Sequence, residues 1–191
     1  MFYKEISKTL FYGRLTPRQK RGIETKLTAF DIYDIFDVRW QAYMLATCYH
    51  ETARAMQPIE EIGKGAGRPY GKKIKYNRKV YVEPDKLYYG RGDVQLTWYE
   101  NYELMGKLLK YPLLKYPELA LEPDISVRIM IEGMTKGISN RGDFTGVSLE
   151  DYFNNYKDDP INARRIINGV DQANRIAGYY QHFLDAFKKA M

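Results

Sequence analysis

Three glutamates near the end of one predicted helix are the residues of this chain best suited to chemistry. Glu51 lies late in a mostly apolar helical pattern, where partial desolvation would favour the protonated carboxyl that a general acid needs. Glu60 and Glu61 follow the break at Pro58, so either could fold across a cleft from Glu51. Glycosidases that invert the anomeric carbon need two such carboxyls, one as acid and one to activate water. The simpler interpretations are an ion pair between Glu51 and a neighbour such as Arg54, and a solvated turn for the other two.

A segment rich in aromatic and small polar residues, 88–102, supplies further candidates. Gln95, Thr97 and Asn101 are suited to holding water and sugar hydroxyl groups beside aromatic side chains. Thr97 also has a structural explanation, because together with Glu100 it forms the capping-box pattern of a helix start.

Other common catalytic sets are missing from the sequence. Gly90 and Gly92 are not accompanied by the other residues of either glycine-rich nucleotide-binding motif. The two histidines, His50 and His182, and the single cysteine give no zinc-ligand cluster. Cys48 and His50 are two residues apart and so point to different helix faces, which argues against a nucleophilic pair. These absences favour acid–base chemistry by carboxylates.

Length and composition predict one soluble globular domain over residues 1–191. The chain is 45% hydrophobic and 28% charged, and no linker or repeat divides it. The longest apolar run, residues 42–49, is too short for a membrane helix, and residues 1–12 lack the apolar core of a signal peptide. Cys48 permits no internal disulfide, so we expect a buried thiol in a protein made in a reducing compartment.

The net charge of +6 is concentrated in residues 1–26 and 62–82. The second cluster has seven lysines and arginines and no acidic residue. A basic surface favours a polyanionic partner such as nucleic acid, anionic lipid or an acidic cell wall, unless it is only a solvated face.

Periodicity and capping signals predict a mainly helical α+β fold with one small hairpin. Thr16, Pro17 and Gln19 form a capping box at one helix start. Further helices are expected at 37–57, 97–110, 124–137, 148–155, 160–168 and 171–189. Strand-like runs within the glycine-rich stretch 63–92 predict the hairpin. Together these elements suggest a lysozyme-like, two-lobed arrangement with a cleft between unequal halves.

Three groups of motifs follow one another along the chain: His50-Glu51-Thr52, then Tyr89-Gly90-Arg91-Gly92 leading to Gln95-Leu96-Thr97 and Asn101-Tyr102, and finally Ile166-Ile167-Asn168-Gly169. In their residues, order and approximate spacing they resemble family 19 glycoside hydrolases, the chitinase-like family that includes bacteriophage endolysins. They span about residues 40–180, and residues 13–16 and 56–59 look like the short phage and prophage members.

The resemblance implies single displacement with inversion and no metal or organic cofactor. Glu51 matches the general acid, and Glu61, or its neighbour Glu60, matches the second carboxylate. Thr97 falls where the family has a Ser or Thr that helps to hold the nucleophilic water. Gln95 and Asn101 would line the same cleft.

Two residues nearer the C-terminus complete the implied site. Asn168 matches an Asn near the floor that binds sugar, and Arg175 matches an Arg that supports the second acid. The chain departs from the family at residues 53–54, where a Gly pair often follows the first acid, and at Val170, where another Gly is usual.

The expected substrate is bacterial peptidoglycan, cut in its glycan strand by a monomeric, muramidase-like phage or prophage endolysin. The short chain, the basic charge and the missing signal peptide favour this over chitin, and no wall-binding module is visible. Such an enzyme would stay in the host cytoplasm until its release to the wall, with neither nucleic acid nor stable membrane insertion involved. The alternatives are a chitinase and a lysozyme-like scaffold that binds a polyanion without catalysis.

Overall fold

The structure is a computed structural model that describes residues 1–66 and 88–191. It is mostly helical with small antiparallel strand pairs, which confirms the predicted fold class. The α-helices are α1 (Phe2–Leu10), α2 (Pro17–Ile32), α3 (Val38–Glu51), α4 (Tyr99–Leu109), α5 (Pro123–Met134), α6 (Arg165–Asn168) and α7 (Ala173–Ala190). Short 3-10 helices lie at Pro117–Leu121, Leu149–Asp151 and Asn162–Arg164. The strands are β1 (Ile59–Glu60), β2 (Arg91–Gly92), β3 (Phe153–Asn154) and β4 (Lys157–Asp158).

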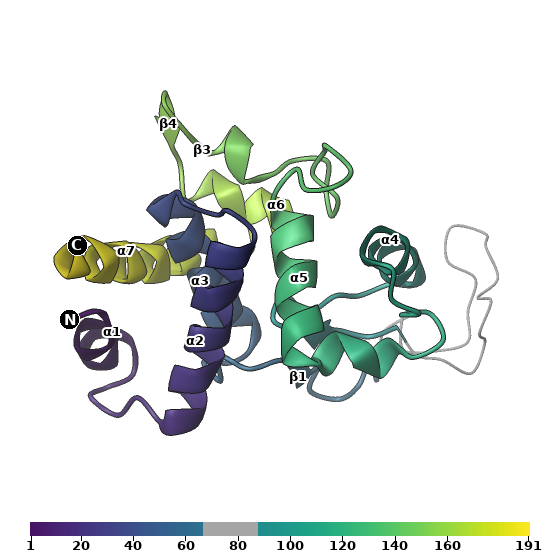
Figure 1. Ribbon diagram of the computed structural model, residues 1–191, viewed down its shortest axis with the longest axis horizontal. Helices are drawn as coiled ribbons and strands as arrows, with labels where there is room; N and C mark the ends of the chain where they lie inside the picture. Colours follow the sequence, from purple (N-terminus) through teal and green to yellow (C-terminus); the bar gives the residue numbers. More distant parts are fainter. Residues whose placement is uncertain (67–87) are drawn as a thin grey trace.

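The centre of the core is α3, because its residues 42–49 are all buried. It packs most extensively against α7, and α7 in turn packs against α1, so that the two termini lie near each other (Figure 1). Phe2 of α1 stacks on Phe187 of α7 with ring centroids 4.7 Å apart. On the other side of α2 and α3, α5 stands between them and α4 (Figure 1).

Local signals predicted several of these elements correctly. The Thr16 hydroxyl accepts a hydrogen bond from the Gln19 backbone, and Gln19 reaches back to the Thr16 backbone, so the capping box is confirmed. The predicted core face of α7 is also confirmed, with Ile176, Tyr180 and Phe183 buried. Cys48 is buried and free, as expected.

Several predicted boundaries were wrong. The helix expected over 124–137 ends at Met134, and the one expected over 160–168 is a 3-10 turn followed by the short α6. The helix expected over 37–57 ends at Glu51, and the one expected from Thr97 begins at Tyr99 without a side-chain cap. The helix expected over 148–155 is a single 3-10 turn followed by the β3–β4 pair. In addition, the amphipathic helix α1, with Phe2, Ile6 and Leu10 buried, was not anticipated.

The expected hairpin within 63–92 and the second basic cluster, 62–82, fall mainly on residues 67–87, which lie outside the described residues. At their boundary β1 pairs with β2 in antiparallel register, Ile59 opposite Gly92 and Glu60 opposite Arg91. No described helix is long and apolar enough to span a membrane.

Candidate active site

Five predicted site residues line one hollow of about 430 Å³. They are Glu51, Gln95, Thr97, Asn101 and Asn168. They come from the end of α3, the segment before α4, α4 itself and the end of α6. A larger hollow of about 660 Å³ lies between α2 and α5, but it contains none of these residues. The smaller one is the candidate active site, because five residues singled out from the sequence, among them the candidate acid Glu51, line it together.

Glu51 reaches this hollow because α3 ends at that residue. The hydroxyl of Thr52 donates to the Cys48 carbonyl at 2.7 Å and accepts from the Met56 backbone N–H at 3.1 Å. Ala53 then takes a left-handed conformation with φ 48°, which turns the chain out of the helix. The apolar pattern that suggested a longer helix continues past this point, but the local hydrogen bonds of Thr52 end it.

Arg164 holds the carboxylate of Glu51. Its Nη1 donates to Glu51 Oε1 at 2.6 Å, and its Nε donates to the carbonyl of Asp171 at 2.9 Å. The side chains are 3% and 15% exposed, so the pair is largely shielded from water. Arg54, the partner considered from sequence, instead donates to the Tyr12 hydroxyl at 3.0 Å. The expected ion pair of Glu51 with an arginine is therefore present, but its partner is Arg164 and not Arg54.

Sequence reasoning missed Arg164, which is 113 residues from Glu51. The signal available was its position just before the Ile166–Gly169 motif, but that does not say which acid it meets. Arg175, the arginine singled out by resemblance, is exposed on α7 and does not line the hollow.

His50 is next to Glu51, and burial and nearby charged groups shift the pKa of its imidazole. Burial lowers the pKa of His50, Glu51 raises it, and Arg164 and Arg175 lower it again, with a net lowering. The imidazole is therefore neutral at pH 7. Arg175 thus contributes to the electrostatics of this end of α3.

A chain of short-range hydrogen bonds orders the opposite wall. Gln95 has φ 54°, and its Nε2 donates to the carbonyls of Ile59 at 3.0 Å and Gly92 at 3.2 Å. Thr97 donates its hydroxyl proton to the Gln95 carbonyl at 2.7 Å, and Asn101 Nδ2 donates to the Thr97 carbonyl at 2.9 Å. The Thr97 oxygen therefore keeps lone pairs with which it can accept a hydrogen bond from water. Because Thr97 does not cap α4, its capping-box explanation was wrong.

Behind this wall lies a fully buried ion pair. Lys26 Nζ is 2.8 Å from Asp93 Oδ1, and the side chains are 1% and 0% exposed. Asp93 also accepts from Cys48 Sγ at 3.3 Å and from Ser126 Oγ at 2.9 Å. The network joins α2, α3 and α5 to the start of the segment that carries Gln95 and Thr97.

The apolar part of the hollow is formed by Trp98, Phe144 and Ile167. The tip of the Phe144 ring lies so close to α5 that a Cβ added at Gly133 would be 2.0 Å from its Cζ atom. Gly133 therefore allows the ring to approach the helix. Asn168, beside Ile167, is the last residue of α6, and Gly169 with φ 53° ends the helix there.

The two candidates for the second carboxylate lie at β1. Glu60 accepts from the Tyr89 hydroxyl at 2.7 Å and pairs with Lys64 at 3.1 Å. The Tyr89 bond, followed by Lys64, lowers the pKa of Glu60, so its carboxylate stays ionised at neutral pH. Glu61 Oε2 accepts from the Gly90 backbone N–H at 3.0 Å. Neither carboxyl lines the 430 Å³ hollow.

Among residues 1–66 and 88–191, no group of three or more His, Cys, Asp or Glu side chains is arranged to hold a metal ion.

Part of the chain is similar in sequence to plant endochitinases. No family model matches the chain. Basic endochitinase CHB4 of Brassica napus is 41% identical over 88 residues, which is 46% of this chain and 31% of that protein. Acidic endochitinase WIN6 of Populus trichocarpa is 38% identical over 108 residues, 51% of this chain and again 31% of the relative. The matched segments thus span only about a third of the length of these curated relatives.

Solved structures match over more of the chain. A bacterial family 19 chitinase has a TM-score of 0.57 at 22% identity, covering 87% of this chain and 84% of that one. Chitinase C from Streptomyces griseus HUT6037 has a TM-score of 0.59 at 22% identity, covering 87% and 82%. The chain is therefore related in sequence to plant endochitinases over about half its length, and it has the lysozyme-like fold of family 19 chitinases.

Proposed function

We propose that this chain is a glycoside hydrolase that cuts the glycan strand of bacterial peptidoglycan by single displacement with inversion. The observation that carries the proposal is the meeting of Glu51 with Gln95, Thr97, Asn101 and Asn168 in one hollow. A carboxyl that shares a hollow with a hydroxyl and three amides suits proton donation on one side of a sugar and water binding on the other.

In this mechanism Glu51 protonates the oxygen of the glycosidic bond as it breaks. Thr97 accepts a hydrogen bond from the attacking water, which approaches the anomeric carbon from the opposite face. Glu61 or Glu60 takes the proton from that water. Successive residues of an extended chain point to opposite faces, so only one of the two can face the glycan.

Arg164 orients the acid in the resting protein. Its two hydrogen bonds, to Glu51 and to the Asp171 carbonyl, fix the carboxylate at the edge of the hollow.

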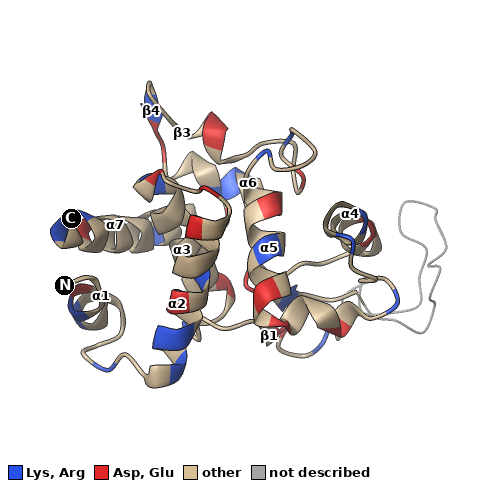
Figure 2. Ribbon diagram, in the orientation of Figure 1, with Lys and Arg blue, Asp and Glu red and all other residues tan. Residues whose placement is uncertain are grey.

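The net charge of +6 supports an anionic wall polymer as substrate. Lysines and arginines gather at the start of α2 and beside the two chain termini (Figure 2). The role that fits this substrate is that of a phage or prophage endolysin which lyses the host from within and reaches the wall from the cytoplasm.

Chitin is the second candidate substrate, favoured by the names of the relatives, which are endochitinases and chitinases. Both polymers contain β-1,4-linked N-acetylglucosamine, so the same acid–base machinery serves either. The hydrolytic chemistry and the choice of polymer are therefore tested separately.

The test of the chemistry is clearing of chloroform-permeabilised Gram-negative cells by purified protein. Glu51→Gln should abolish clearing, whereas Glu118→Gln, at an exposed glutamate outside the hollow, should leave it unchanged. Mass spectrometry of the released fragments then identifies the bond that breaks, and NMR of the first-formed anomer shows whether its configuration is inverted. Clearing that survives Glu51→Gln would refute the assignment of the acid.

The test of the substrate is hydrolysis of chitin and of soluble N-acetylglucosamine oligomers by the same preparations. Turnover of chitin without clearing of walls would replace the peptidoglycan proposal by the second candidate. A folded wild-type protein that hydrolyses neither polymer would overturn both.

A further inference from the structure

The hollow of about 660 Å³ between α2 and α5 is distinct from the candidate active site. We call it the α2–α5 groove. Its lining includes the polar and aromatic residues Arg21, Glu24, Tyr33, Tyr111, Asp124 and Arg128. Its volume lies within the range of known ligand sites, and its wall combines apolar surface with a few polar groups, as such sites do.

Arg128 is the residue that distinguishes this groove from a solvated gap. Its guanidinium carbon lies 5.2 Å from the ring centroid of Tyr111 and 5.9 Å from that of Tyr33. Nη1 donates to the Tyr111 hydroxyl at 2.7 Å. An arginine side chain has five N–H donors, and within the described residues the Tyr111 hydroxyl is the one hydrogen-bond acceptor of Arg128. Because Arg128 lines the groove, acceptor oxygens of a bound molecule would find N–H donors there.

The charges of the groove favour an uncharged ligand. Arg21 and Arg128 are balanced by Glu24 and Asp124, and Glu24 also has Lys20 within 3.6 Å. A balanced wall attracts neither a polyanion nor a polycation, whereas paired donors and acceptors suit hydroxyl and acetamido groups.

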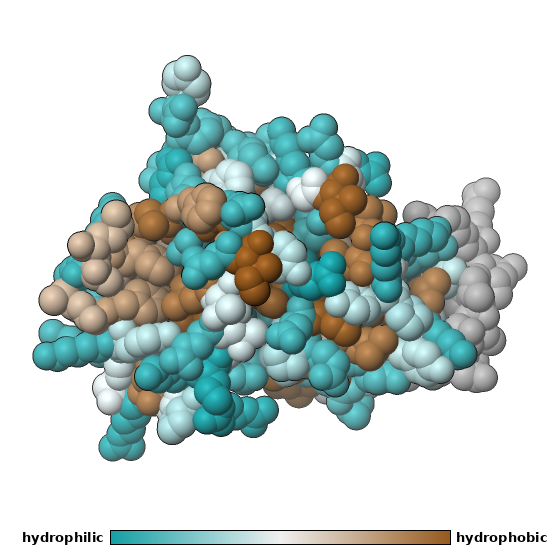
Figure 3. Space-filling view, in the orientation of Figure 1, coloured by the Kyte–Doolittle hydropathy of each residue, from teal (hydrophilic) through white to brown (hydrophobic). Residues whose placement is uncertain are grey.

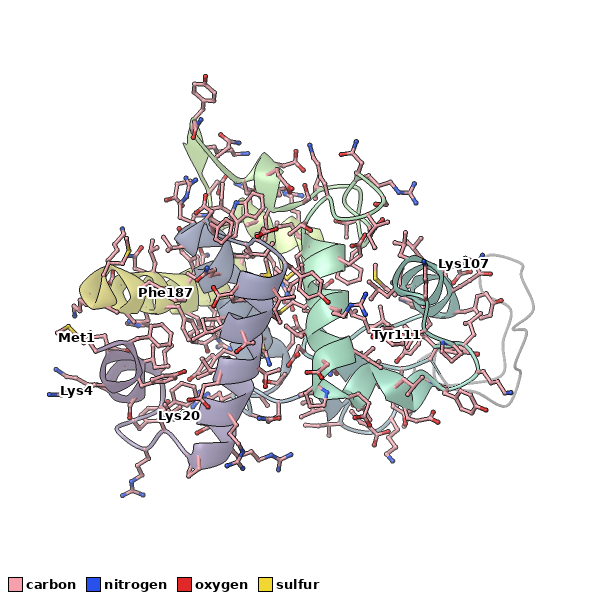
Figure 4. The ribbon with its side chains drawn as sticks, viewed as in Figure 1. Met1, Lys4, Lys20, Lys107, Tyr111 and Phe187 are labelled. Atoms are coloured by element: carbon pink, nitrogen blue, oxygen red, sulfur yellow. The ribbon has the colours of Figure 1, made fainter. Side chains whose placement is uncertain are left out.

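Exposed apolar surface accompanies these polar groups. Ile32 is 67% exposed and Tyr33 is 40% exposed at the end of α2. Tyr111 lies beside α5 (Figure 4), and apolar residues interrupt the hydrophilic surface over α2 and α5 (Figure 3). Aromatic and aliphatic side chains at the edge of a polar groove provide the apolar faces against which sugar rings pack.

Helix α5 separates the groove from the active site. Asp124, Val127 and Arg128 line the groove. Ser126, which bonds Asp93, and Gly133, which supports Phe144, lie about half a turn away on the opposite face. The two hollows are therefore separated by roughly the diameter of a helix, about 10–12 Å.

We propose that the α2–α5 groove is a second glycan-binding site, which holds a β-1,4-linked N-acetylhexosamine segment while another segment is in the active site. The ligand class rests on the proposed function, whereas the existence of a site rests on Arg128 and the groove itself. An enzyme that acts on an insoluble polymer would remain at its surface through such a site between catalytic events.

The experiment uses the full chain carrying Glu51→Gln, so that the probe is not hydrolysed. The probe is the β-1,4-linked tetramer of N-acetylglucosamine, followed by amide shifts in NMR and by calorimetry. The proposal predicts two sites, one that shifts α2 and α5 amides and one that shifts the α4 segment. Adding Arg128→Met should weaken the first site about tenfold or more, because a hydrogen bond to a charged group is lost.

Two further variants keep the test independent of folding. Arg14→Met, at an exposed arginine outside the groove, is the matched control and should leave both sites unchanged. Thr28→Trp places a bulky side chain at an exposed position in the groove and should block the first site even if Arg128→Met is unstable.

The outcomes separate this inference from the proposed function. Binding at the α4 segment alone overturns the second site and leaves the proposed function standing. Binding at α2 and α5 alone supports the second site and counts against the active-site assignment. Binding at neither place overturns the second site and counts against the proposed substrate class.

Discussion

Replacing Lys26 by methionine tests whether the buried ion pair behind the active site holds the fold together. The substitution keeps most of the side-chain volume but removes the ammonium group that lies 2.8 Å from Asp93. The Asp93 carboxylate, which is fully buried, would then lack its counter-ion and keep only its bonds from Cys48 and Ser126.

Removing one partner of a buried pair costs about 3–5 kcal/mol, because the remaining charge is uncompensated. Because Asp93 keeps two hydrogen-bond donors, we expect Lys26→Met to lower the free energy of unfolding by about 3 kcal/mol, near the lower end of this range. For a domain of this length, each kcal/mol lowers the melting temperature by about 2–4 °C, so we expect a decrease of about 6–12 °C. The double variant Lys26→Met/Asp93→Asn should be more stable than Lys26→Met alone, because it removes the uncompensated charge.

Urea unfolding followed by circular dichroism and tryptophan fluorescence gives the free energies of unfolding. Lys20→Met is the matched control, since Lys20 and Glu24 form a half-exposed pair at 3.6 Å. That pair should contribute less than about 1 kcal/mol. Equal losses for Lys26→Met and Lys20→Met, or a double variant no more stable than Lys26→Met, would refute the reasoning.

Three other predictions concern packing, pH dependence and the active site. Gly22→Ala should destabilise the protein, because the added Cβ would lie 1.8 Å from a backbone carbonyl oxygen. Gly178→Ala, whose added Cβ has nothing within 4 Å, should stabilise it by about 0.5–1 kcal/mol. Urea unfolding measures both changes, and a stabilised Gly22→Ala would contradict the packing described for Gly22. Burial raises the pKa of Glu132, so the stability it contributes is present below its unfolded pKa and is lost as pH rises through its folded pKa. Glu132→Gln should therefore gain stability relative to wild type as pH rises above about 4.5 in thermal melts, and a constant difference across pH would count against this. For hydrolysis of the proposed substrate, Arg164→Met should lower kcat more than it raises KM, because it frees Glu51 and leaves in place the amides that we propose bind sugar. An unchanged kcat would exclude a positioning role.

Elements that depend on neighbours within a few residues could be predicted from the sequence alone. The capping box at Thr16 follows from an i, i+3 spacing, and the buried face of α7 follows from helical periodicity. Motif order also selected Glu51, Gln95 and Asn168, which do line one hollow. In each case the relevant information lies in one short stretch of chain.

Where two local signals competed, the sequence did not show which would prevail. The apolar pattern of α3 extends toward Pro58, but the hydroxyl of Thr52 bonds the backbone on both sides and ends the helix at Glu51. Thr97 and Glu100 have the spacing of a capping box, but the Thr97 hydroxyl donates to the Gln95 carbonyl instead. The outcome depended on which hydrogen bonds the surrounding packing allowed.

Which charged side chains form ion pairs depends on how the helices pack. Arg164 reaches Glu51 across 113 residues, and Lys26 reaches Asp93 because α2, α3 and α5 pack around both. A buried charge is unfavourable until its partner is in place, so composition and spacing give no reason to expect either pair. The physical reason is that local hydrogen bonds are encoded by spacing along the chain, whereas long-range ion pairs exist only after the helices have packed.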